Sequence, residues 1–184
     1  MLVCPPWLSW TLINPVRGLT QDPERVLRPF IKEGDTVADV GCGPGYFTAA
    51  MAKLVGGSGR VIATDIQEWM LERVRIRVEK EGLSNRVRLH LARPGGLDLP
   101  AGRVNFALAF WMAHEVPDRD RLFAEILASL APGGALLLVE PRLHVGARSF
   151  TAIAGAALRS GFLSVGPVSV RLSRAVLLRK APAL

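Results

Sequence analysis

Cysteine is nearly absent from this chain of 184 residues, which contains only Cys4 and Cys42. Two cysteines cannot build a disulfide framework, so the sequence excludes a disulfide-rich scaffold and fits a reducing compartment. Long apolar runs are also missing, since none approaches the ~20 residues of a membrane span. The N-terminal segment lacks a basic region and carries Pro5 and Pro6, which argues against a signal peptide. We therefore expect a cytoplasmic protein without a membrane partner.

Concentrated positive charge is missing as well, although the formal net charge is +7. The arginines are scattered, and no Lys/Arg run with interleaved aromatics occurs, so the charge does not favour a nucleic-acid partner. His90 and His144 have no partner at metal-ligand spacing, and no metal site is predicted. With 49% apolar and 21% charged residues, the composition is that of an ordinary globular protein with one full core.

The most informative stretch runs from Val37 to Phe47. Residues 36–40 have the β-branched and small side chains of a buried strand, with the carboxylate of Asp39 near its end. Three glycines follow at alternate positions, and an apolar helical pattern begins after them. Strand, glycine loop and helix form the unit that brings backbone close to a nucleotide-like ligand, because a Cβ would fill the ligand's space.

The spacing of the three glycines limits which classes of ligand the loop can bind. A phosphate-binding loop needs a Lys after its last glycine, and none is present. A dinucleotide fingerprint wants a third glycine where the bulky Tyr46 stands. A tight turn without any ligand remains an alternative.

The pattern Gly-x-Gly-x-Gly resembles the class I S-adenosylmethionine (SAM)-dependent methyltransferases, in particular their type 11, UbiE-like small-molecule branch. The resemblance covers roughly residues 22–180 and includes helix, Pro-Gly-Gly, strand and Glu-Pro between residues 119 and 141. It implies SAM as cofactor, S-adenosylhomocysteine (SAH) as product, and methyl transfer to a small-molecule acceptor by in-line SN2 displacement. This sequence departs from the family at Ala92–Arg93, where an acidic residue is common, and at Asn105, where Asp is usual.

Strand and helix patterns alternate along the chain. Strands are predicted at 36–41, 60–65, 86–91, 104–110 and 135–140, a helix over 119–131, and two strand-like segments at 162–170 and 172–179. With the resemblance, this order predicts an α/β fold: a three-layer, doubly wound, seven-stranded and mostly parallel sheet whose last strand is antiparallel. Residues 1–21, with Trp7 and Trp10, are expected to form an N-terminal arm or lid, and residues 22–184 the SAM-binding domain.

Asp65 stands at the end of the second strand, 20 residues after Gly45. A carboxylate there accepts both hydroxyls of a ribose, and the alternative is a helix N-cap. Ile66 offers an apolar face to an adenine ring, while the backbone of Ala92 and Arg93 and the Arg93 side chain are candidates for its edge and face. The candidate cofactor-binding residues are Asp39, Gly41, Cys42, Gly43, Gly45, Phe47, Asp65, Ile66, Gln67, Ala92, Arg93 and Phe110.

Residues 111–118 follow the buried strand that ends at Phe110 and resemble the family's pocket wall beside the transferable methyl group. His114 and Glu115 are the candidate catalytic residues. His114 is a candidate base for an acceptor hydroxyl, and the alternative is a structural histidine bonded to backbone at a helix start. Glu115 is a candidate partner of His114 or of an acceptor amine, and the alternative is a turn cap.

Two other functions remain open at this point. A non-catalytic SAM-binding sensor or accessory protein would show the same loop and the same Asp65. A nicotinamide-dependent oxidoreductase is disfavoured by Tyr46 and by the lack of a Tyr-x-x-x-Lys pair. The sequence leaves the acceptor unidentified, and it leaves both a monomer and a homodimer open.

Overall fold

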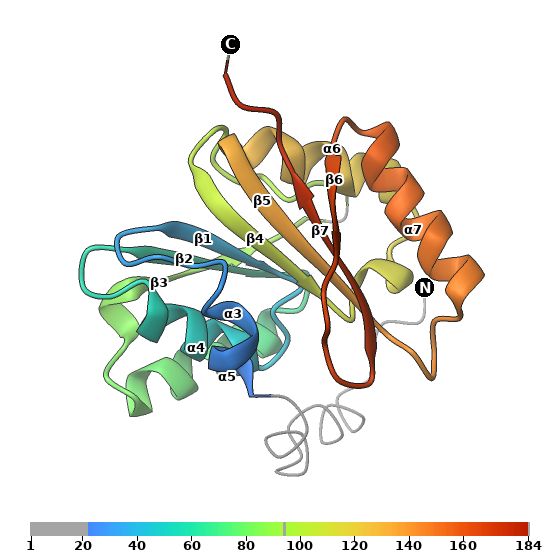
Figure 1. Cartoon of the computed structure of the whole chain (residues 1–184). Helices are drawn as coiled ribbons and strands as arrows, with labels where there is room; N and C mark the ends of the chain where they lie inside the picture. The colour runs from blue at the N-terminus through green and yellow to red at the C-terminus, as the bar shows by residue number, and fades with distance from the viewer. Residues whose placement is uncertain (1–21, 94, 184) are drawn as a thin grey trace.

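The computed structural model describes residues 22–93 and 95–183, and it contains one seven-stranded sheet in the order β3-β2-β1-β4-β5-β7-β6 (Figure 1). Strands β1 to β5 pair in parallel, and β7 is antiparallel to both β5 and β6. The predicted fold class, including the antiparallel last strand, is confirmed. The strands are β1 Thr36–Val40, β2 Arg60–Asp65, β3 Val87–Leu91, β4 Val104–Phe110, β5 Leu130–Pro141, β6 Leu163–Pro167 and β7 Ser173–Arg179.

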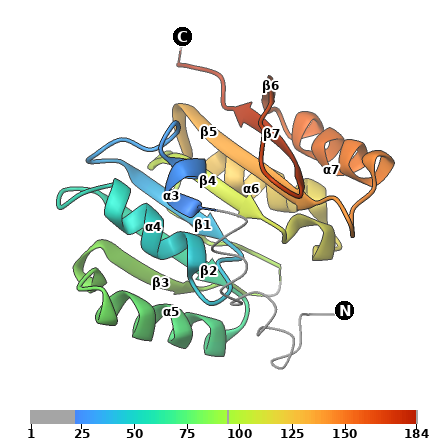
Figure 2. The same ribbon diagram turned by 60° about the horizontal axis from the view of Figure 1, so that its bottom comes forward.

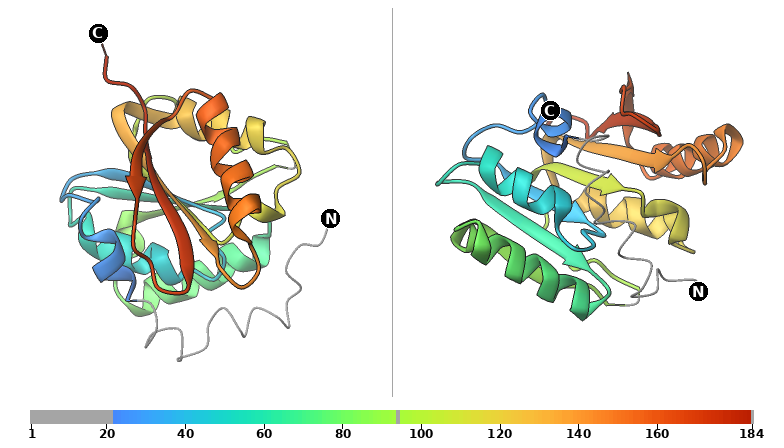
Figure 3. Two further views of the ribbon diagram at one scale, coloured as in Figure 1. Left: turned by 45° about the vertical axis from the view of Figure 1, so that its right-hand side comes forward. Right: turned by 90° about the horizontal axis from the view of Figure 1, so that it is seen from below.

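Helices cover both faces of the sheet. Figure 2 shows α3, α4 and α5 on one face, with α6 and α7 on the other, and Figure 3 shows the same three layers from two further sides. The helices are α3 Pro23–Leu27, α4 Tyr46–Leu54, α5 Glu68–Lys80, α6 Arg119–Ser129 and α7 Ala147–Arg159, and the short 3-10 helices are η2 Ser84–Arg86 and η3 Ala113–Glu115.

The central strand β4 divides the core into two. Phe106 and Leu108 pack with α3, α4 and α5, whereas Ala107 and Ala109 pack with α6 and α7. Successive strand residues point to opposite faces, so an uninterrupted apolar run is what a strand covered on both sides requires. This explains why the strand lacks the polar alternation of a solvent-facing one.

The boundary between α6 and β5 differs from the sequence prediction. The predicted helix over 119–131 is two residues too long, because α6 ends at Ser129 and Leu130 is already extended and paired with Val104. The predicted Pro-Gly-Gly turn lies inside an irregular start of β5. Gly134 is required there, since a Cβ would lie 2.9 Å from the Ala131 carbonyl oxygen.

The topology places a crevice at the carboxyl ends of the central strands. β1 lies between β2 and β4, so the chain leaves it in opposite directions at the switch point where open α/β sheets bind ligands. The expected N-terminal arm, with Trp7 and Trp10, lies outside the described residues. Within the described part of the chain, no helix is both long enough and apolar enough to cross a membrane.

Candidate functional site

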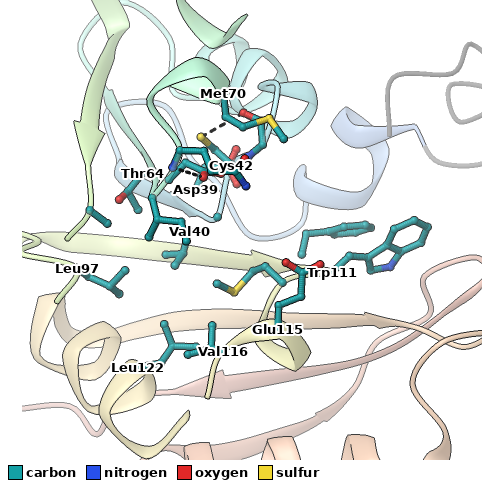
Figure 4. Close-up of a pocket in the computed structure, with 18 of the residues that line it drawn as sticks. Asp39, Val40, Cys42, Thr64, Met70, Leu97, Trp111, Glu115, Val116 and Leu122 are labelled. Carbon is teal, nitrogen blue, oxygen red and sulfur yellow. Dashed lines mark hydrogen bonds between the residues drawn. The ribbon is translucent and has the colours of Figure 1, made fainter. Parts of the chain in front are cut away.

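A cavity of about 410 Å³ opens at this crevice, between the glycine loop, the ends of β1, β2 and β4, and the start of α6. Its volume lies within the range of small-molecule sites. Figure 4 shows Asp39, Cys42 and Met70 along one side, and Leu97, Val116 and Leu122 along the other. The glycine loop and its neighbours therefore lie opposite a group of apolar side chains.

The three glycines of the loop differ in what makes them necessary. All three have positive φ, at 67° for Gly41, 52° for Gly43 and 81° for Gly45. A Cβ at Gly41 would lie 2.9 Å from Met112, and one at Gly45 would lie 3.0 Å from Val74. A Cβ at Gly43 would meet no atom of residues 22–93 and 95–183 within 4 Å, although Gly43 lines the cavity. Within this part of the chain, the space beside Gly43 is therefore open.

Asp65 ties the glycine loop to the end of β2. Its Oδ2 accepts a hydrogen bond from the Gly43 backbone N–H at 3.0 Å, and its Oδ1 accepts one from the Gln67 N–H at 2.9 Å. The side chain lines the cavity and is 9% exposed. Burial raises the pKa of Asp65, and the backbone hydrogen bonds oppose that shift. The carboxylate thus organises the loop and the start of α5 while it still borders the cavity.

Two further groups of the glycine-loop wall are buried. Asp39 is 2% exposed, and its Oδ2 accepts a hydrogen bond from the Thr48 hydroxyl at 2.6 Å. The Cys42 thiol donates to the Gly43 carbonyl at 3.6 Å. Burial raises the pKa of Cys42 well above its usual value, with Asp39 and Asp65 adding to the effect. The thiol is therefore neutral and acts as part of the apolar lining.

The loop after β3 is held by internal hydrogen bonds. The Ala92 N–H donates to the Asp65 carbonyl, and the Arg93 N–H donates to the Gly96 carbonyl. Both backbone donors that were candidates for an adenine edge therefore already have partners. The Leu97 N–H donates to Glu125 of α6, so the loop is fastened across the cavity to the opposite layer.

Trp111 is the first residue after β4 and has φ of 59°, unusual for a bulky side chain. Its backbone N–H donates to the Val139 carbonyl at 2.7 Å, and its indole Nε1 donates to the Ser173 hydroxyl at 3.0 Å. These bonds to β5 and β7 hold the strained residue in place. Such strain is concentrated at functional sites, and here it fixes an aromatic wall at one end of the cavity.

His114 and Glu115 lie in η3, directly beyond Trp111, and they have different surroundings. Glu115 lines the cavity with 41% of its side chain exposed, whereas His114 is 16% exposed and does not line it. Both carboxylate oxygens of the fully buried Glu140 accept hydrogen bonds from His114, at 2.5 Å from Nδ1 and 3.2 Å from the backbone N–H. The hydrogen bond that His114 donates to Glu140 raises the pKa of His114, and burial raises the pKa of Glu115.

The structure brings most of the candidate residues to one cavity. Gly45 and His114 do not line the cavity. Gly45 packs against Val74 instead. The candidate cofactor-binding residues that line the cavity are Asp39, Gly41, Cys42, Gly43, Phe47, Asp65, Ile66, Gln67, Ala92, Arg93 and Phe110.

Sequence reasoning missed the contribution of α6 and of β5. Arg121, Leu122 and Glu125 line the cavity from the first turns of α6, and Glu140 supports His114 from behind. A signal for Glu140 was present, since it is a carboxylate at the end of an apolar strand, as Asp39 and Asp65 are. No group of three potential metal ligands occurs within residues 22–93 and 95–183.

The family follows from comparison of the sequence with known proteins. Residues 37–134, just over half of the chain, match the model of a methyltransferase domain family. The chain belongs to this family. The match begins at β1 with the glycine loop and ends in β5, so it contains nearly all of the cavity wall of this methyltransferase domain. The resemblance to class I methyltransferases of the small-molecule type is confirmed.

Curated relatives are similar over the same core. The "Ubiquinone/menaquinone biosynthesis C-methyltransferase UbiE" of Hydrogenovibrio crunogenus is 33% identical over 110 residues, which are 60% of this chain and 43% of that protein. The UbiE protein of Escherichia coli is 31% identical over 110 residues, which are 44% of that protein's length. The chain thus spans less than half the length of these relatives.

Solved structures match over nearly the whole chain. A "SAM dependent methyltransferase from Aquifex aeolicus" is 27% identical with a TM-score of 0.87, and the match covers 96% of this chain and 99% of that one. A Methanococcus maripaludis structure described as an S-adenosyl-L-methionine-dependent methyltransferase matches with a TM-score of 0.78 at 16% identity, which bears on the fold alone. The match to the Aquifex protein therefore extends over almost the full length of both chains.

Proposed function

We propose that this protein is a SAM-dependent methyltransferase that acts on a small molecule. The observation that carries the proposal is the cavity itself. It joins the open space beside Gly43, the buried carboxylate of Asp65 and an apolar far wall at the switch point of a methyltransferase fold. The SAM-dependent relative from Aquifex aeolicus supports the cofactor assignment.

The residues of the cavity fit the parts of SAM. The carboxylate of Asp65 would accept the two ribose hydroxyls, since two acceptor oxygens match two neighbouring donors. Gly41 and Gly43 would pass beneath the methionine part, where the absence of a Cβ at Gly43 leaves room. Ile66, which is 47% exposed beside the cavity, would cover an adenine face and lose that exposure.

The acceptor would lie at the end of the cavity formed by Trp111 and Glu115. The surrounding side chains Met112, Val116 and Leu122 are apolar, so the site suits an acceptor with an apolar body. Glu115 provides a carboxylate among them, as Figure 4 shows, with Trp111 and Val116 on either side. An acceptor with one hydroxyl or amine on an apolar ring matches this arrangement.

The residues of the chain would act by positioning, by excluding water and by accepting a proton. SAM supplies a methyl group on a positively charged sulfur, which departs with the electron pair of the broken carbon–sulfur bond. The apolar wall keeps water from the nucleophile, and the rigid Trp111 limits its approach directions. The Glu115 carboxylate would take the proton from an acceptor that must lose one.

The test is release of SAH by the purified full chain, measured by mass spectrometry over a panel of phenols and aromatic amines with SAM present. We expect SAH and a methylated product in equal amounts with at least one acceptor, and loss of both in Asp65→Ala. SAM binding without SAH release from any acceptor would overturn the proposal and favour a non-catalytic SAM sensor. Calorimetry with SAM on the same preparation separates these two outcomes.

A further inference from the structure

Behind Glu115 lies a pair of titratable side chains, Glu140 and His114, that the proposed function does not use. Glu140 has no exposed side-chain surface, and both of its oxygens accept hydrogen bonds from His114. On the other side of the imidazole, His114 Nε2 lies 3.9 Å from Oε1 of Glu115. The three side chains thus form a line from the core to the cavity, which we call the Glu140–His114–Glu115 array.

The array contains two carboxylates and one imidazole. A fully buried carboxylate is costly unless a positive group neutralises it, and the Nδ1–H of a protonated His114 is the nearest such group. An imidazolium donates from both ring nitrogens, and its Nε2 lies 3.9 Å from the Glu115 carboxylate. A full positive charge on His114 therefore lies between the two carboxylates and attracts both.

We propose that Glu140 is a positioning residue that holds His114 as an imidazolium, and that His114 in turn keeps the pocket carboxylate of Glu115 ionised and aimed at the acceptor. This inference rests on the proposed function only in assuming that a methyl acceptor binds beside Glu115. It deepens that function, because an ionised Glu115 selects acceptors that give up a proton when they are methylated, such as phenols and amines. The proton of the acceptor would then reside on the Glu115 carboxylate.

Other charged groups face the array and enter its balance. The Arg119 guanidinium on α6 donates to the carbonyls of Ala113 and His114, and its positive charge opposes protonation of His114. The ring of His144 lies edge-on to that of His114, with centroids 5.1 Å apart. Asp65 across the cavity repels the negative charge of Glu115. Burial and the charges of Glu140 and Asp65 raise the pKa of Glu115, whereas the positive charge of His114 lowers it, so loss of the His114 charge would hinder ionisation of Glu115.

The experiment is an NMR titration of the full chain, with ¹³C-labelled glutamate carboxyls and labelled histidine rings, and it needs no acceptor. Spectra of Glu115→Gln and His114→Asn assign the two signals. In the wild type we expect the pKa of the His114 ring to lie above its ordinary value of 6.5. In Glu140→Gln we expect the His114 midpoint to fall by at least about one pH unit, because the imidazolium loses its hydrogen-bonded carboxylate. In His114→Asn we expect the Glu115 midpoint to rise, because the carboxylate loses a neighbouring positive charge.

Glu125→Gln is the matched control, because it removes another carboxylate that lines the cavity without touching His114. It should leave the His114 midpoint unchanged. If Glu140→Gln does not fold, as judged by its thermal transition, the wild type and His114→Asn still decide the matter. A wild-type His114 midpoint at or below its ordinary value, or a Glu115 midpoint unmoved in His114→Asn, would overturn the array. Absence of SAH release would instead overturn only the methyltransferase proposal.

Discussion

At the scale of single residues, the site depends on carboxylates at the ends of parallel strands. Asp39, Asp65 and Glu140 lie at or near the carboxyl ends of β1, β2 and β5, and all three are buried. Each one has a hydrogen-bond partner: the Thr48 hydroxyl, two backbone N–H groups, and His114. Their burial is tolerated because the bonds compensate for lost hydration. Asp39 and Asp65 border the cavity, whereas Glu140 supports its wall through His114.

Replacement of Asp65 by Ala should weaken SAH binding by about 2–3 kcal/mol. The ribose hydroxyls lose a charged acceptor, and the Gly43 N–H loses the bond that holds the loop. Isothermal calorimetry on the full chain measures the change. Glu68→Ala is the control, because it removes an exposed neighbouring carboxylate outside the cavity. Less than a threefold loss of affinity in Asp65→Ala would remove Asp65 from the site.

The His114–Glu140 pair should make stability depend on pH. The hydrogen bond that His114 donates to Glu140 raises the pKa of His114 above its ordinary value of 6.5. A raised histidine pKa contributes stability that is fully present below the unfolded value and is lost as the pH rises through the folded value. We expect the difference in unfolding free energy between the wild type and His114→Asn to be largest near or below pH ~6.5 and to shrink above it. Urea denaturation across pH checks this, and a constant difference contradicts it.

At the scale of elements, the glycine loop and the segment η3–α6 form opposite walls of the cavity. The loop is held by Asp65 from β2 and by Arg77 of α5, whose Nε donates to the Pro44 carbonyl at 3.2 Å. The opposite wall is held by the Asp118 cap of α6 and by Trp111. Both walls are thus fixed by hydrogen bonds to neighbouring elements, which is the preorganisation that a ligand site requires.

Alanine at Gly43 and at Gly45 should have different effects. Both residues have positive φ, so each substitution should cost about 1 kcal/mol of stability. Gly45→Ala should cost more, because its Cβ would press on Val74. Gly43→Ala should lose at least about tenfold in SAH affinity, since its Cβ would occupy space left for the ligand. Thermal unfolding and calorimetry on both variants test this, and equal affinity losses would refute the distinction.

The N-cap of α6 should contribute to stability, and two substitutions of Asp118 separate its hydrogen bond from its charge. The Asp118 Oδ1 accepts a hydrogen bond from the Arg121 N–H at 3.0 Å. Asp118→Ala should therefore destabilise the protein by about 1 kcal/mol. Asp118→Asn keeps a good cap and should change little. Chemical denaturation of the two variants provides the comparison, and an equal loss in both would show that charge, not the cap, is responsible.

At the scale of the whole molecule, the sheet could be predicted well from the sequence. Its strands are marked by local features and by the pattern of apolar and polar residues. The uninterrupted apolar run of β4 reads directly as a strand covered on both faces, and Asp22 with Pro23 marks the start of α3. The end of α6 was missed because the residues up to Ala131 keep an apolar helical pattern. The pairing of Leu130 with Val104, a tertiary contact, is what ends the helix.

The candidate site was predictable where its residues follow the carboxyl ends of strands that the sequence itself reveals. The glycine loop after β1, Asp65 at the end of β2 and Phe110 at the end of β4 are such cases. The Glu140–His114 contact joins residues 26 positions apart, and the Leu97–Glu125 bond joins residues 28 apart. Neither follows from spacing, because each depends on which elements share the carboxyl edge of the sheet. The proposed roles of His114 and Glu115 remain predictions, now with different surroundings for each.

The central claim is that this cavity holds SAM rather than another nucleotide. Isothermal calorimetry of the purified full chain with SAH, and in parallel with NAD, tests it most directly. We predict one SAH bound per chain, no detectable heat with NAD, and a marked loss of SAH binding in Gly43→Ala. Tight binding of NAD, or SAH binding that is unaffected by a side chain at Gly43, would contradict the account.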